Sequence, residues 1–412
     1  MVESRALTTY LSGEKEARWN YVAGLVANSV LKTWLQYPEQ TAYYEAVKRY
    51  ADACLKGQDT IAVGESNLDD LAAGKIFFVL YRTELAKGNT EDATRYKNCV
   101  TFFRNKMKHN HSRIALPLQG VGGFFHKAQY PNQMWLDGLY MGPALYAEWQ
   151  YNFGEEEGLD SNNESWTDIA NQFITIHTHT YNAETGLNYH AWSADPEDPN
   201  SFWAKKKAPY LGCSYEFWGR GMGWYFAALV DVLELMPKTH EDYIEIQDIA
   251  NQVAAGLKRW QDNESGCWFQ LLQYGKDLIS NPSGEESGGK IYNQCDHSNY
   301  LESSASSMFT YAYLKGIRTG TLNKDEYLPV ALKAYKGLLD TFIRTEDDNT
   351  LSIIQSCNSA GLGPARNPAR TGTINYYLCG PDVTVVQNEG KAIGPFIMAS
   401  LEYELLKKSD SK

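Results

Sequence analysis

The sequence predicts an all-α fold in which helical hairpins close into a ring, and three observations support that expectation. Apolar residues recur with helical periodicity along most of the 412 residues, whereas strand-like alternation is confined to two short segments. The helical segments follow one another in pairs, and long loops come after alternate helices, as in a closed barrel. No fixed sequence period marks an open solenoid. We therefore expect a toroid of about six hairpins with its loops gathered at one end.

The individual helices are predicted from apolar periodicity and from the residues that flank each run. The helical segments are 15–36, 41–56, 67–87, 91–109, 133–151, 163–181, 216–236, 241–262, 300–319, 325–345 and 390–407. The strand-like segments are 266–273 and 373–379. Six hairpins need one helix more than these eleven. No linker divides the chain, so we expect residues 1–412 to form a single domain.

Four longer connections are rich in Gly, Pro, Asn, His and aromatic residues, as functional loops often are. They span 110–132, 183–215, 274–299 and 346–389. The chain also contains 28 Tyr and 11 Trp. Such rings suit a sugar-binding surface, although a large helical core also uses them as filler.

The overall charge and hydropathy exclude several classes of partner. The formal net charge is −12, which argues against nucleic acid and anionic membranes as main partners. No apolar run approaches the length that crosses a membrane, and no charged-then-apolar leader follows Met1. We expect a soluble protein with a cytoplasmic location, present as a monomer or a weak homodimer.

Seven cysteines are scattered along the chain without a CxxC pair. Their odd number and wide spacing argue against a disulfide framework and a structural zinc site, so we expect buried free thiols. The pairs His109/His111 and His177/His179 are spaced two apart, which is poor helical spacing for a shared metal ion. No HExxH motif is present. We therefore predict no metal and no cofactor.

An acidic residue interrupts an apolar run in YPNQMWLDGLYMGPALY, residues 130–146. A helix that starts near Asn132 would place Asp137 more than one turn inside it. An exposed acid stabilised by the helix dipole is one interpretation, but the neighbours leave little polar face. A carboxylate buried among aromatic rings has a raised pKa, which suits a general acid. Gly138 and Gly142 share a face and would admit a ligand or another backbone.

Two further acids, Asp69 and Asp70, lie in ESNLDDLAAGK. Ser66 with Asp69, or Asn67 with Asp70, has the spacing of a capping box, with Asp in place of the usual Glu. These residues alone favour a capping role. The AAG that follows permits close helix packing.

Loop histidines and one arginine are the remaining candidates. His126 in GGFFHKAQYP and His190 in NYHAWSAD lie in loops, where local hydrogen bonding and function are equally open. Arg220 lies between Trp218 and Trp224 in YEFWGRGMGWYFAAL. An arginine flanked by tryptophans suits a carboxylate on a ring-shaped ligand, and cation–π packing inside the core is the alternative.

Five blocks of the sequence together resemble the unsaturated rhamnogalacturonyl hydrolases of glycoside hydrolase family 105. The blocks are GGFFHKAQYPNQMWLDGLYMGP, NYHAW, SYEFWGRGMGWYFAALVDVLELMP, NYLESSASSMFTYAYLKGIRTG, and GTINYYL with KAIGPFIMA. They occur in order over nearly the whole chain. The resemblance implies an (α/α)6 barrel and metal-free hydration of the C4=C5 double bond in a terminal unsaturated uronic acid left by a polysaccharide lyase.

The resemblance also implies roles for individual residues. Asp137 takes the position of the general acid/base, and Asp69 that of a second active-site carboxylate, which leaves Asp70 as the helix cap. The expected substrate-binding residues are His126, Lys127, Trp135, His190, Trp218, Arg220 and Trp224. Arg220, His190 and Lys127 are equally open as the cation that neutralises the uronate.

This sequence departs from the family pattern at three places. Ser193 follows HAW where the family often has an acid, the segment 194–210 is longer and more basic, and Ala392 replaces a usual Gly. The first two lie near the expected sugar site and leave the sugar on the leaving side open, with rhamnose as the family expectation.

Two other functions remain open. One is an inverting glycoside hydrolase on saturated oligosaccharides, with Asp69 and Asp137 as its acid and base. The other is a non-catalytic sugar-binding toroid, because a fold alone does not establish an activity.

Overall fold

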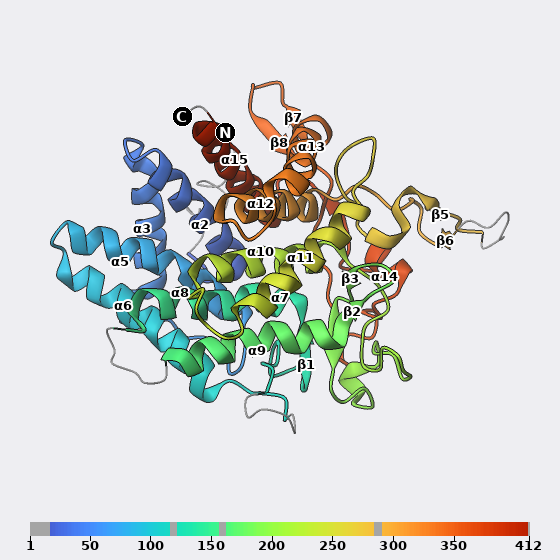
Figure 1. Cartoon of the computed structure of the whole chain (residues 1–412), viewed down its shortest axis with the longest axis horizontal. Coiled ribbons are helices and arrows are strands. Elements are labelled where there is room, and N and C mark those ends of the chain that lie inside the picture. Colours follow the sequence, from blue (N-terminus) through green and yellow to red (C-terminus); the bar gives the residue numbers. More distant parts are fainter. Residues whose placement is uncertain (1–16, 116–121, 156–161, 284–290, 411–412) are drawn as a thin grey trace.

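Six columns of helix form a closed inner ring among the residues that the structure describes. The structure is a computed structural model and describes residues 17–115, 122–155, 162–283 and 291–410 (Figure 1). The inner columns, in order, are α2 (Tyr21–Gln36); α4 (Asp69–Ala72), η2 (Ala73–Lys75) and α5 (Ile76–Ala86); α7 (Leu136–Met141) and α8 (Pro143–Phe153); α10 (Gly219–Leu235); α12 (Ser303–Thr319); and α15 (Gly390–Asp410). Each column packs on the next, and α15 packs on α2, which closes the ring.

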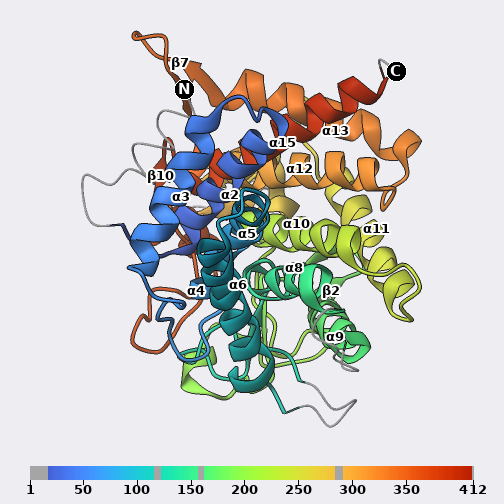
Figure 2. The same cartoon turned by 90° about the vertical axis from the view of Figure 1, so that its left-hand side faces the viewer.

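The outer helices lie against this ring and are amphipathic. They are α3 (Thr41–Leu55), α6 (Thr90–Asn105), α9 (Asn162–Thr180), α11 (Tyr243–Arg259) and α13 (Lys324–Phe342), and Figure 2 shows α3 and α6 from the outside. On α11 the buried residues follow helical spacing, with Tyr243, Ile246, Ile249, Ala250 and Val253 inward. Almost every residue of α10 and α12 is buried, because an inner helix has neighbours on all sides.

The eleven predicted helices are all present, and the predicted all-α (α/α)6 barrel is confirmed. Within the described ranges α15 has no outer partner, which accounts for the odd number of helices. The columns approach closely where small residues meet. A Cβ on Gly24 of α2 would lie 2.3 Å from the Cβ of Ala73, so only glycine permits this contact. Among the described residues, no helix has the length and apolar character needed to cross a membrane.

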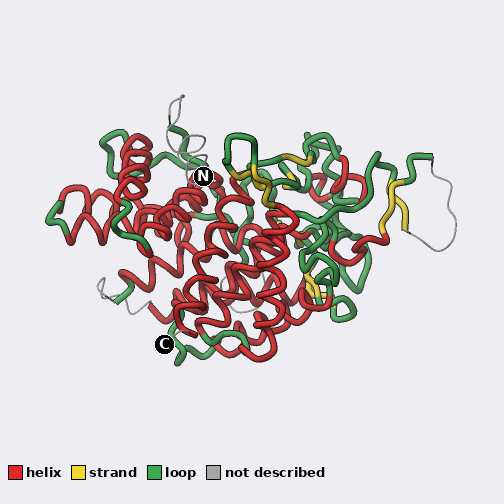
Figure 3. Tube along the Cα trace, turned by 90° about the horizontal axis from the view of Figure 1, so that it is seen from above, coloured by secondary structure: helices red, strands yellow, loops and turns green. Residues whose placement is uncertain are grey.

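Strands and loops gather on one side of the helices (Figure 3). Strand β1 (Gln133–Trp135) pairs antiparallel with β4 (Ala191–Ser193). The other two-stranded pairs are β2 (Tyr181–Asn182) with β3 (Leu187–Asn188), β5 (Leu278–Ser280) with β6 (Ile291–Asn293), β7 (Ile343–Thr345) with β8 (Leu351–Ile353), and β9 (Ser356–Cys357) with β10 (Val385–Val386). The short helical segments in these loops are η3 (Lys106–Asn110), η4 (Pro199–Ser201) and η5 (Leu272–Asp277).

Both strand predictions are wrong. Residues 266–271 make only isolated bridges, Phe269 with Leu301 and Leu271 with Trp218, and residues 272–273 begin the helical segment η5. Residues 373–379 contain the helix α14 (Ile374–Cys379). Its N-cap is Thr373, whose hydroxyl accepts a hydrogen bond from the Tyr376 amide. The cap and tertiary packing outweigh the strand preference of the aromatic and β-branched residues there.

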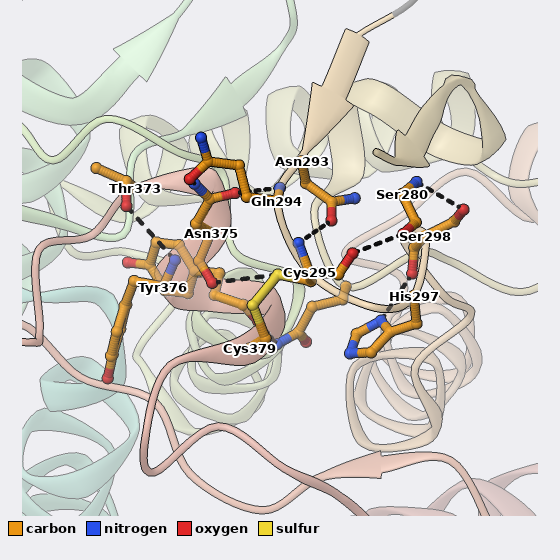
Figure 4. The surroundings of a disulfide bond; sticks show 12 residues. Ser280, Asn293, Gln294, Cys295, His297, Ser298, Thr373, Asn375, Tyr376 and Cys379 are labelled. Atoms are coloured by element: carbon orange, nitrogen blue, oxygen red, sulfur yellow. Dashed lines mark hydrogen bonds between the residues drawn. A yellow bond between two sulfur atoms is a disulfide. The ribbon is translucent and has the colours of Figure 1, made fainter. Parts of the chain in front are cut away.

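The prediction of free thiols is wrong for two cysteines. Cys295, after β6, forms a disulfide with Cys379 at the end of α14, across 84 residues of sequence (Figure 4). The sequence offers no sign of this pairing, because two cysteines so far apart meet only through the fold. The other five cysteines are free thiols, buried or half-buried, as expected.

Candidate active site

The N-terminal ends of the inner helices converge on one region. Tyr21 is the first residue of α2, Asp69 the first of α4, and Asp137 the second of α7. Burial raises the pKa of the Tyr21 phenol far above its ordinary value, and the charges of Asp69, Arg220 and Asp137 all act on that phenol. Residues from four inner columns therefore meet around Tyr21. Helix N-termini carry partial positive charge, which favours carboxylates at this end of the barrel.

Asp69 is held by the loop that carries His126 and Lys127. Asn67 forms a β-bridge with Lys127, and the Leu68 amide donates to the His126 carbonyl at 3.2 Å. This pairing brings the Lys127 ammonium within 2.5 Å of Asp69 Oδ2, and His126 Nε2 within 3.5 Å of Oδ1. Burial lowers the pKa of Lys127, but Asp69 more than offsets this effect and the pKa rises.

The capping prediction holds for neither carboxylate nor for Ser66. The side chain of Asn67 accepts the hydrogen bond from the Asp69 amide at 3.2 Å. Asp70 instead accepts a bond from the Gly64 amide at 2.8 Å, which ties down the preceding loop. The Ser66 hydroxyl contacts the Ser112 hydroxyl at 2.9 Å. Asp69 is therefore free of a capping role.

Asp137 is placed next to His190 by the pairing of β1 with β4. Trp135 lies opposite Ala191 in this pair, and the Leu136 amide donates to the His190 carbonyl at 3.0 Å. Asp137 Oδ2 then lies 2.9 Å from His190 Nε2. A Cβ on Gly221 would lie 3.2 Å from the His190 ring, so this glycine lets α10 approach the pair.

Two expectations for the Asp137 segment are corrected. The helix does not begin near Asn132, which has a left-handed φ of 56°, but at Leu136, so Asp137 lies in the first turn. The expected rise in the Asp137 pKa is also wrong. Burial raises this pKa, but His190 and then His126 lower it more, and the result lies below the ordinary value. The neighbours of Asp137 in the sequence are apolar, but the fold also places His190 against its carboxylate.

Gly138 and Gly142 do not open space for a ligand. A Cβ on Gly138 would lie 3.2 Å from His126 Nδ1 and from Leu68, and one on Gly142 would lie 2.7 Å from Leu68. Side chains of the site loop therefore occupy this line of the helix. Gly138 allows His126 and Leu68 to pack against α7, and Gly142 allows Leu68 and Met107 to do so.

His126 and Trp135 form part of an aromatic stack beside the carboxylates. Their ring centroids are 4.5 Å apart and nearly parallel, and Tyr130 stacks on the other face of Trp135 at 4.6 Å. Burial lowers the pKa of His126 to about 4, despite the attraction of Asp69, so the ring is neutral at pH 7. His126 Nδ1 is buried and has no hydrogen-bond partner among the described residues. It faces Gly138 across a small enclosed space with room for about one water molecule, which can satisfy it.

Arg220 is buried against Trp218 rather than extended toward solvent. Its guanidinium lies 4.8 Å from the centre of the Trp218 ring and donates to the carbonyl of Cys357 and to the Ser304 hydroxyl at 3.3 Å. Trp224 packs on Tyr140 at 4.7 Å, deeper in the barrel. Arg220 therefore makes the cation–π packing that was the alternative to a ligand contact. Its charge still acts on the Tyr21 phenol in the site.

The nine predicted site residues lie in one region, but they differ in access. Side-chain exposure is 17% for Asp69, 14% for Asp137 and 24% for Lys127. The other predicted residues are almost completely buried: His126, Trp135, His190, Trp218, Arg220 and Trp224. A ligand that enters from solvent therefore meets the two carboxylates and the lysine first.

Sequence reasoning missed several polar residues at this end of the barrel. Lys391 forms an ion pair with Glu389 at 2.6 Å and lies 6.0 Å from the Tyr21 ring. Tyr377 of α14 contacts His190 Nδ1 at 2.6 Å. Both lie in the blocks GTINYYL and KAIGPFIMA, so the signal was present without a role attached to it. Among the described residues, no three His, Cys, Asp or Glu side chains are grouped so that they could hold a metal ion.

This arrangement suits acid/base chemistry. Two solvent-accessible carboxylates lie among imidazoles and an ammonium, at the positive ends of helices. Asp137 can exchange a proton with a ligand, and its partner His190 fixes the carboxylate in place. Asp69 and Lys127 can bind hydroxyl groups or orient a water molecule.

Comparisons with known proteins identify the family. A model of glycosyl hydrolase family 88 matches residues 2–295 and 289–407. A solved family 105 glycoside hydrolase of C. acetobutylicum ATCC 824 is 32% identical, with a TM-score of 0.79 over 98% of this chain and 100% of that one. Protein Atu3128 of Agrobacterium fabrum is 32% identical over 224 residues, 54% of this chain and 83% of that protein. An unsaturated 3S-rhamnoglycuronyl hydrolase of Formosa agariphila is 21% identical over 255 residues, 60% of this chain and 57% of that enzyme.

The family match spans almost the whole chain, and the solved family 105 relative aligns with it from end to end. The match agrees with the closed helical ring and with the paired carboxylates at one end of it. The protein is therefore a glycoside hydrolase that matches the glycosyl hydrolase family 88 model over nearly its whole length and belongs to glycoside hydrolase family 105.

Proposed function

We propose that this enzyme releases the 4,5-unsaturated uronic acid from the non-reducing end of lyase-generated oligosaccharides by hydrating the C4=C5 double bond. The observation that carries the proposal is the accessible Asp137 carboxylate, hydrogen-bonded to His190 and placed beside Asp69 and Lys127. One residue can then act first as acid and then as base. Rhamnose is the proposed sugar on the leaving side, which is consistent with the name of the Formosa agariphila relative.

The reaction begins with a proton on Asp137. In the free protein His190 holds the pKa of this carboxyl low, so protonation must accompany substrate binding. The uronate carboxylate of the substrate supplies the cause, because a second negative charge nearby favours the neutral acid. Asp137 donates its proton to C4, and positive character develops at C5 and the ring oxygen.

Water then completes the reaction. The ionised Asp137 takes a proton from the water molecule that attacks C5, and Asp69 with Lys127 holds that water or the neighbouring hydroxyls. The resulting hemiketal opens and expels the remaining oligosaccharide as an alcohol. The carboxyl begins and ends protonated, so one residue serves both steps.

Lys127 is the first candidate for the cation that meets the uronate. It is the most exposed of the three candidate cations, whereas Arg220 is committed to backbone carbonyls and His190 to Asp137 and Tyr377. Lys127→Met should raise KM more than it lowers kcat, because the charge contacts the uronate in the bound state and the transition state alike.

The test is loss of the ultraviolet absorbance of the conjugated double bond, on unsaturated disaccharides made by lyases from rhamnogalacturonan and from glucuronic polymers. Asp137→Asn should lose roughly 10²-fold or more of the wild-type rate while it keeps the fold. Asp70→Asn is the matched control, because that carboxylate accepts a backbone hydrogen bond from the Gly64 amide and its charge acts on Lys127 less than that of Asp69. If reducing sugar is released from saturated oligosaccharides and the absorbance of unsaturated ones stays constant, ordinary hydrolysis replaces hydration.

Three further expectations stay proposals. We propose that the chain works as one (α/α)6 domain, because its described helices close a single ring, and as a monomer or weak homodimer. The cytoplasmic location stays a prediction, and the Cys295–Cys379 disulfide counts against it, since such bonds persist mainly in oxidising compartments. Thiol labelling of freshly isolated protein, with and without reductant, tests whether this bond is present in the cell.

A further inference from the structure

Behind His190, on the side away from Asp137, lies a fully buried tyrosine. The Tyr377 hydroxyl is 2.6 Å from His190 Nδ1, while His190 Nε2 is 2.9 Å from Asp137 Oδ2. His190 and Tyr377 are both 0% exposed. The three residues form a chain from α14 through the loop before β4 to α7. The sequence predicts Asp137 and His190 as site residues, but it does not predict Tyr377.

The direction of the first hydrogen bond follows from what the phenol can reach. Burial raises the pKa of Tyr377 well above its ordinary value, so the hydroxyl keeps its proton. Among the described residues, His190 Nδ1 is the sole hydrogen-bond partner of this hydroxyl. If the hydroxyl accepted a proton from Nδ1, its own O–H would stay buried and unpaired, at a cost of about 1–3 kcal/mol. The phenol therefore donates, and Nδ1 accepts.

We propose that Tyr377 is a positioning residue that holds His190 as the neutral tautomer with its proton on Nε2. His190 then donates to Oδ2 of Asp137, and the acid proton of Asp137 is left on Oδ1 for transfer to the substrate. This inference rests on the proposed function for its catalytic meaning, but the tautomer itself is a property of the free protein. Without Tyr377 the ring is free to carry its proton on Nδ1 and to take up the proton of Asp137.

Other titratable groups face this chain. The His190 amide donates to the Glu216 carbonyl, and the charges of Glu216 and Cys357 act on Tyr377. His126 lies on the other side of Trp135, which packs edge-on against the His190 ring at 5.4 Å. These side chains form no hydrogen bond with the imidazole in the described structure, so the contacts of Asp137 and Tyr377 set its proton.

The segment that carries Tyr377 is fixed from several directions. Gln270 donates to the Tyr377 carbonyl at 2.9 Å, and Trp218 stacks on its ring at 5.9 Å. Two residues further on, Cys379 is joined to Cys295, and the Asn375 side chain accepts a bond from the Gln294 amide at 2.9 Å (Figure 4). The disulfide therefore anchors α14 against the loop after β6, and through α14 it anchors the phenol.

The first experiment is nitrogen NMR of the imidazoles in ¹⁵N-histidine-labelled wild-type protein and in Tyr377→Phe, with His190→Asn to assign the His190 signals. In wild type at pH 7 we expect His190 to be neutral with the proton on Nε2. In Tyr377→Phe we expect the Nε2–H tautomer to lose its dominance. A wild-type His190 that carries its proton on Nδ1, or that is an imidazolium, overturns the proposal.

Activity gives the second readout. Tyr377→Phe should lower kcat roughly tenfold with little change in KM, a smaller loss than the 10²-fold or more expected for removal of the acid. The pH profile of kcat should shift, which a purely structural defect would not produce. Tyr376→Phe is the matched control, because the Tyr376 hydroxyl accepts from the Gly361 amide and bonds to Asp382, not to His190, and should leave the His190 spectrum unchanged.

The outcomes separate the two proposals. If the expected tautomer is found but the wild-type enzyme causes no loss of the ultraviolet absorbance of the double bond, the proposed function fails and the positioning role stands. If Tyr377→Phe folds with an unchanged His190 spectrum and an unchanged pH profile, the positioning role is refuted even where the hydratase activity is present.

Discussion

Two lysines are buried in the barrel in opposite surroundings, and their removal should have opposite effects on stability. Lys75, on η2, is 5% exposed, and its ammonium has no hydrogen-bond partner among the described residues but lies 3.4 Å from the centre of the Tyr140 ring. Lys315, on α12, is 4% exposed, and its ammonium lies 2.6 Å from Asp231 and 2.7 Å from Glu234. The Lys75 ammonium therefore has no carboxylate partner among the described residues, whereas the Lys315 ammonium has two.

The size of the effect at Lys75 follows from its pKa. Burial lowers this pKa to about 8 from 10.5, because desolvation outweighs the attraction of Asp231 and Glu148. At about 1.4 kcal/mol per pKa unit, the buried ammonium lowers the free energy of unfolding by about 3 kcal/mol at pH 7. The unfolded chain binds the proton more tightly, so this penalty is complete below pH 8 and fades as the pH approaches 10.5.

Lys75→Met, which keeps a similar length, should therefore raise the free energy of unfolding by up to about 3 kcal/mol at pH 7 and by much less at pH 10. Lys315→Met should lower it by about 3 kcal/mol, because it leaves the largely buried Asp231 without its ammonium, whereas Glu234 is more exposed and keeps its ion pair with Arg318. Urea unfolding followed by tryptophan fluorescence at both pH values, always as the difference from wild type, measures these changes.

One result would refute the reasoning. If Lys75→Met is destabilised equally at pH 7 and pH 10, the charge is not a burden in the folded state. The contact with Tyr140 would then outweigh desolvation, and Tyr140→Leu should lower the stability of wild type but not that of the Lys75 variant.

Three other perturbations test the site and its frame. Asp69→Asn should fold normally and lower kcat/KM about 10²-fold, because it removes the carboxylate that holds Lys127; a wild-type rate would remove Asp69 from the mechanism. Cys295→Ser should lower the free energy of unfolding by roughly 4 kcal/mol, since the lost bond with Cys379 closes a loop of 84 residues; an unchanged urea midpoint would contradict this. Glu302→Gln should cost about 2 kcal/mol, measured by the same unfolding assay, because its buried carboxylate accepts bonds from two backbone amides; an equally stable variant would show those amides satisfied otherwise.

The helices could be predicted because their signal is local. The outer helix α11 shows its apolar stripe directly, and the inner α10 is a long apolar run that is buried in the ring of helices. The beginning of α7 could not be predicted. Residues 133–135 continue the apolar helical pattern, but the backbone reverses at Asn132, with its positive φ, and pairs with β4. That choice depends on a strand about sixty residues away.

The identities of the site residues were likewise accessible from motifs, while their charge states were not. Apolar neighbours in sequence suggested that Asp137 would have a raised pKa, but His190 lies 53 residues further along the chain and reverses the sign. The low pKa of Asp137 changes the proposed order of events, because the carboxyl must gain its proton before it can donate one. An acid that is ionised in the free enzyme becomes a donor only when an anionic substrate arrives, so substrates without the uronate charge should bind without being protonated. The charge of the substrate would then serve as part of the catalyst, and a methyl ester of the same unsaturated disaccharide should be turned over more slowly than the free acid, mainly through kcat.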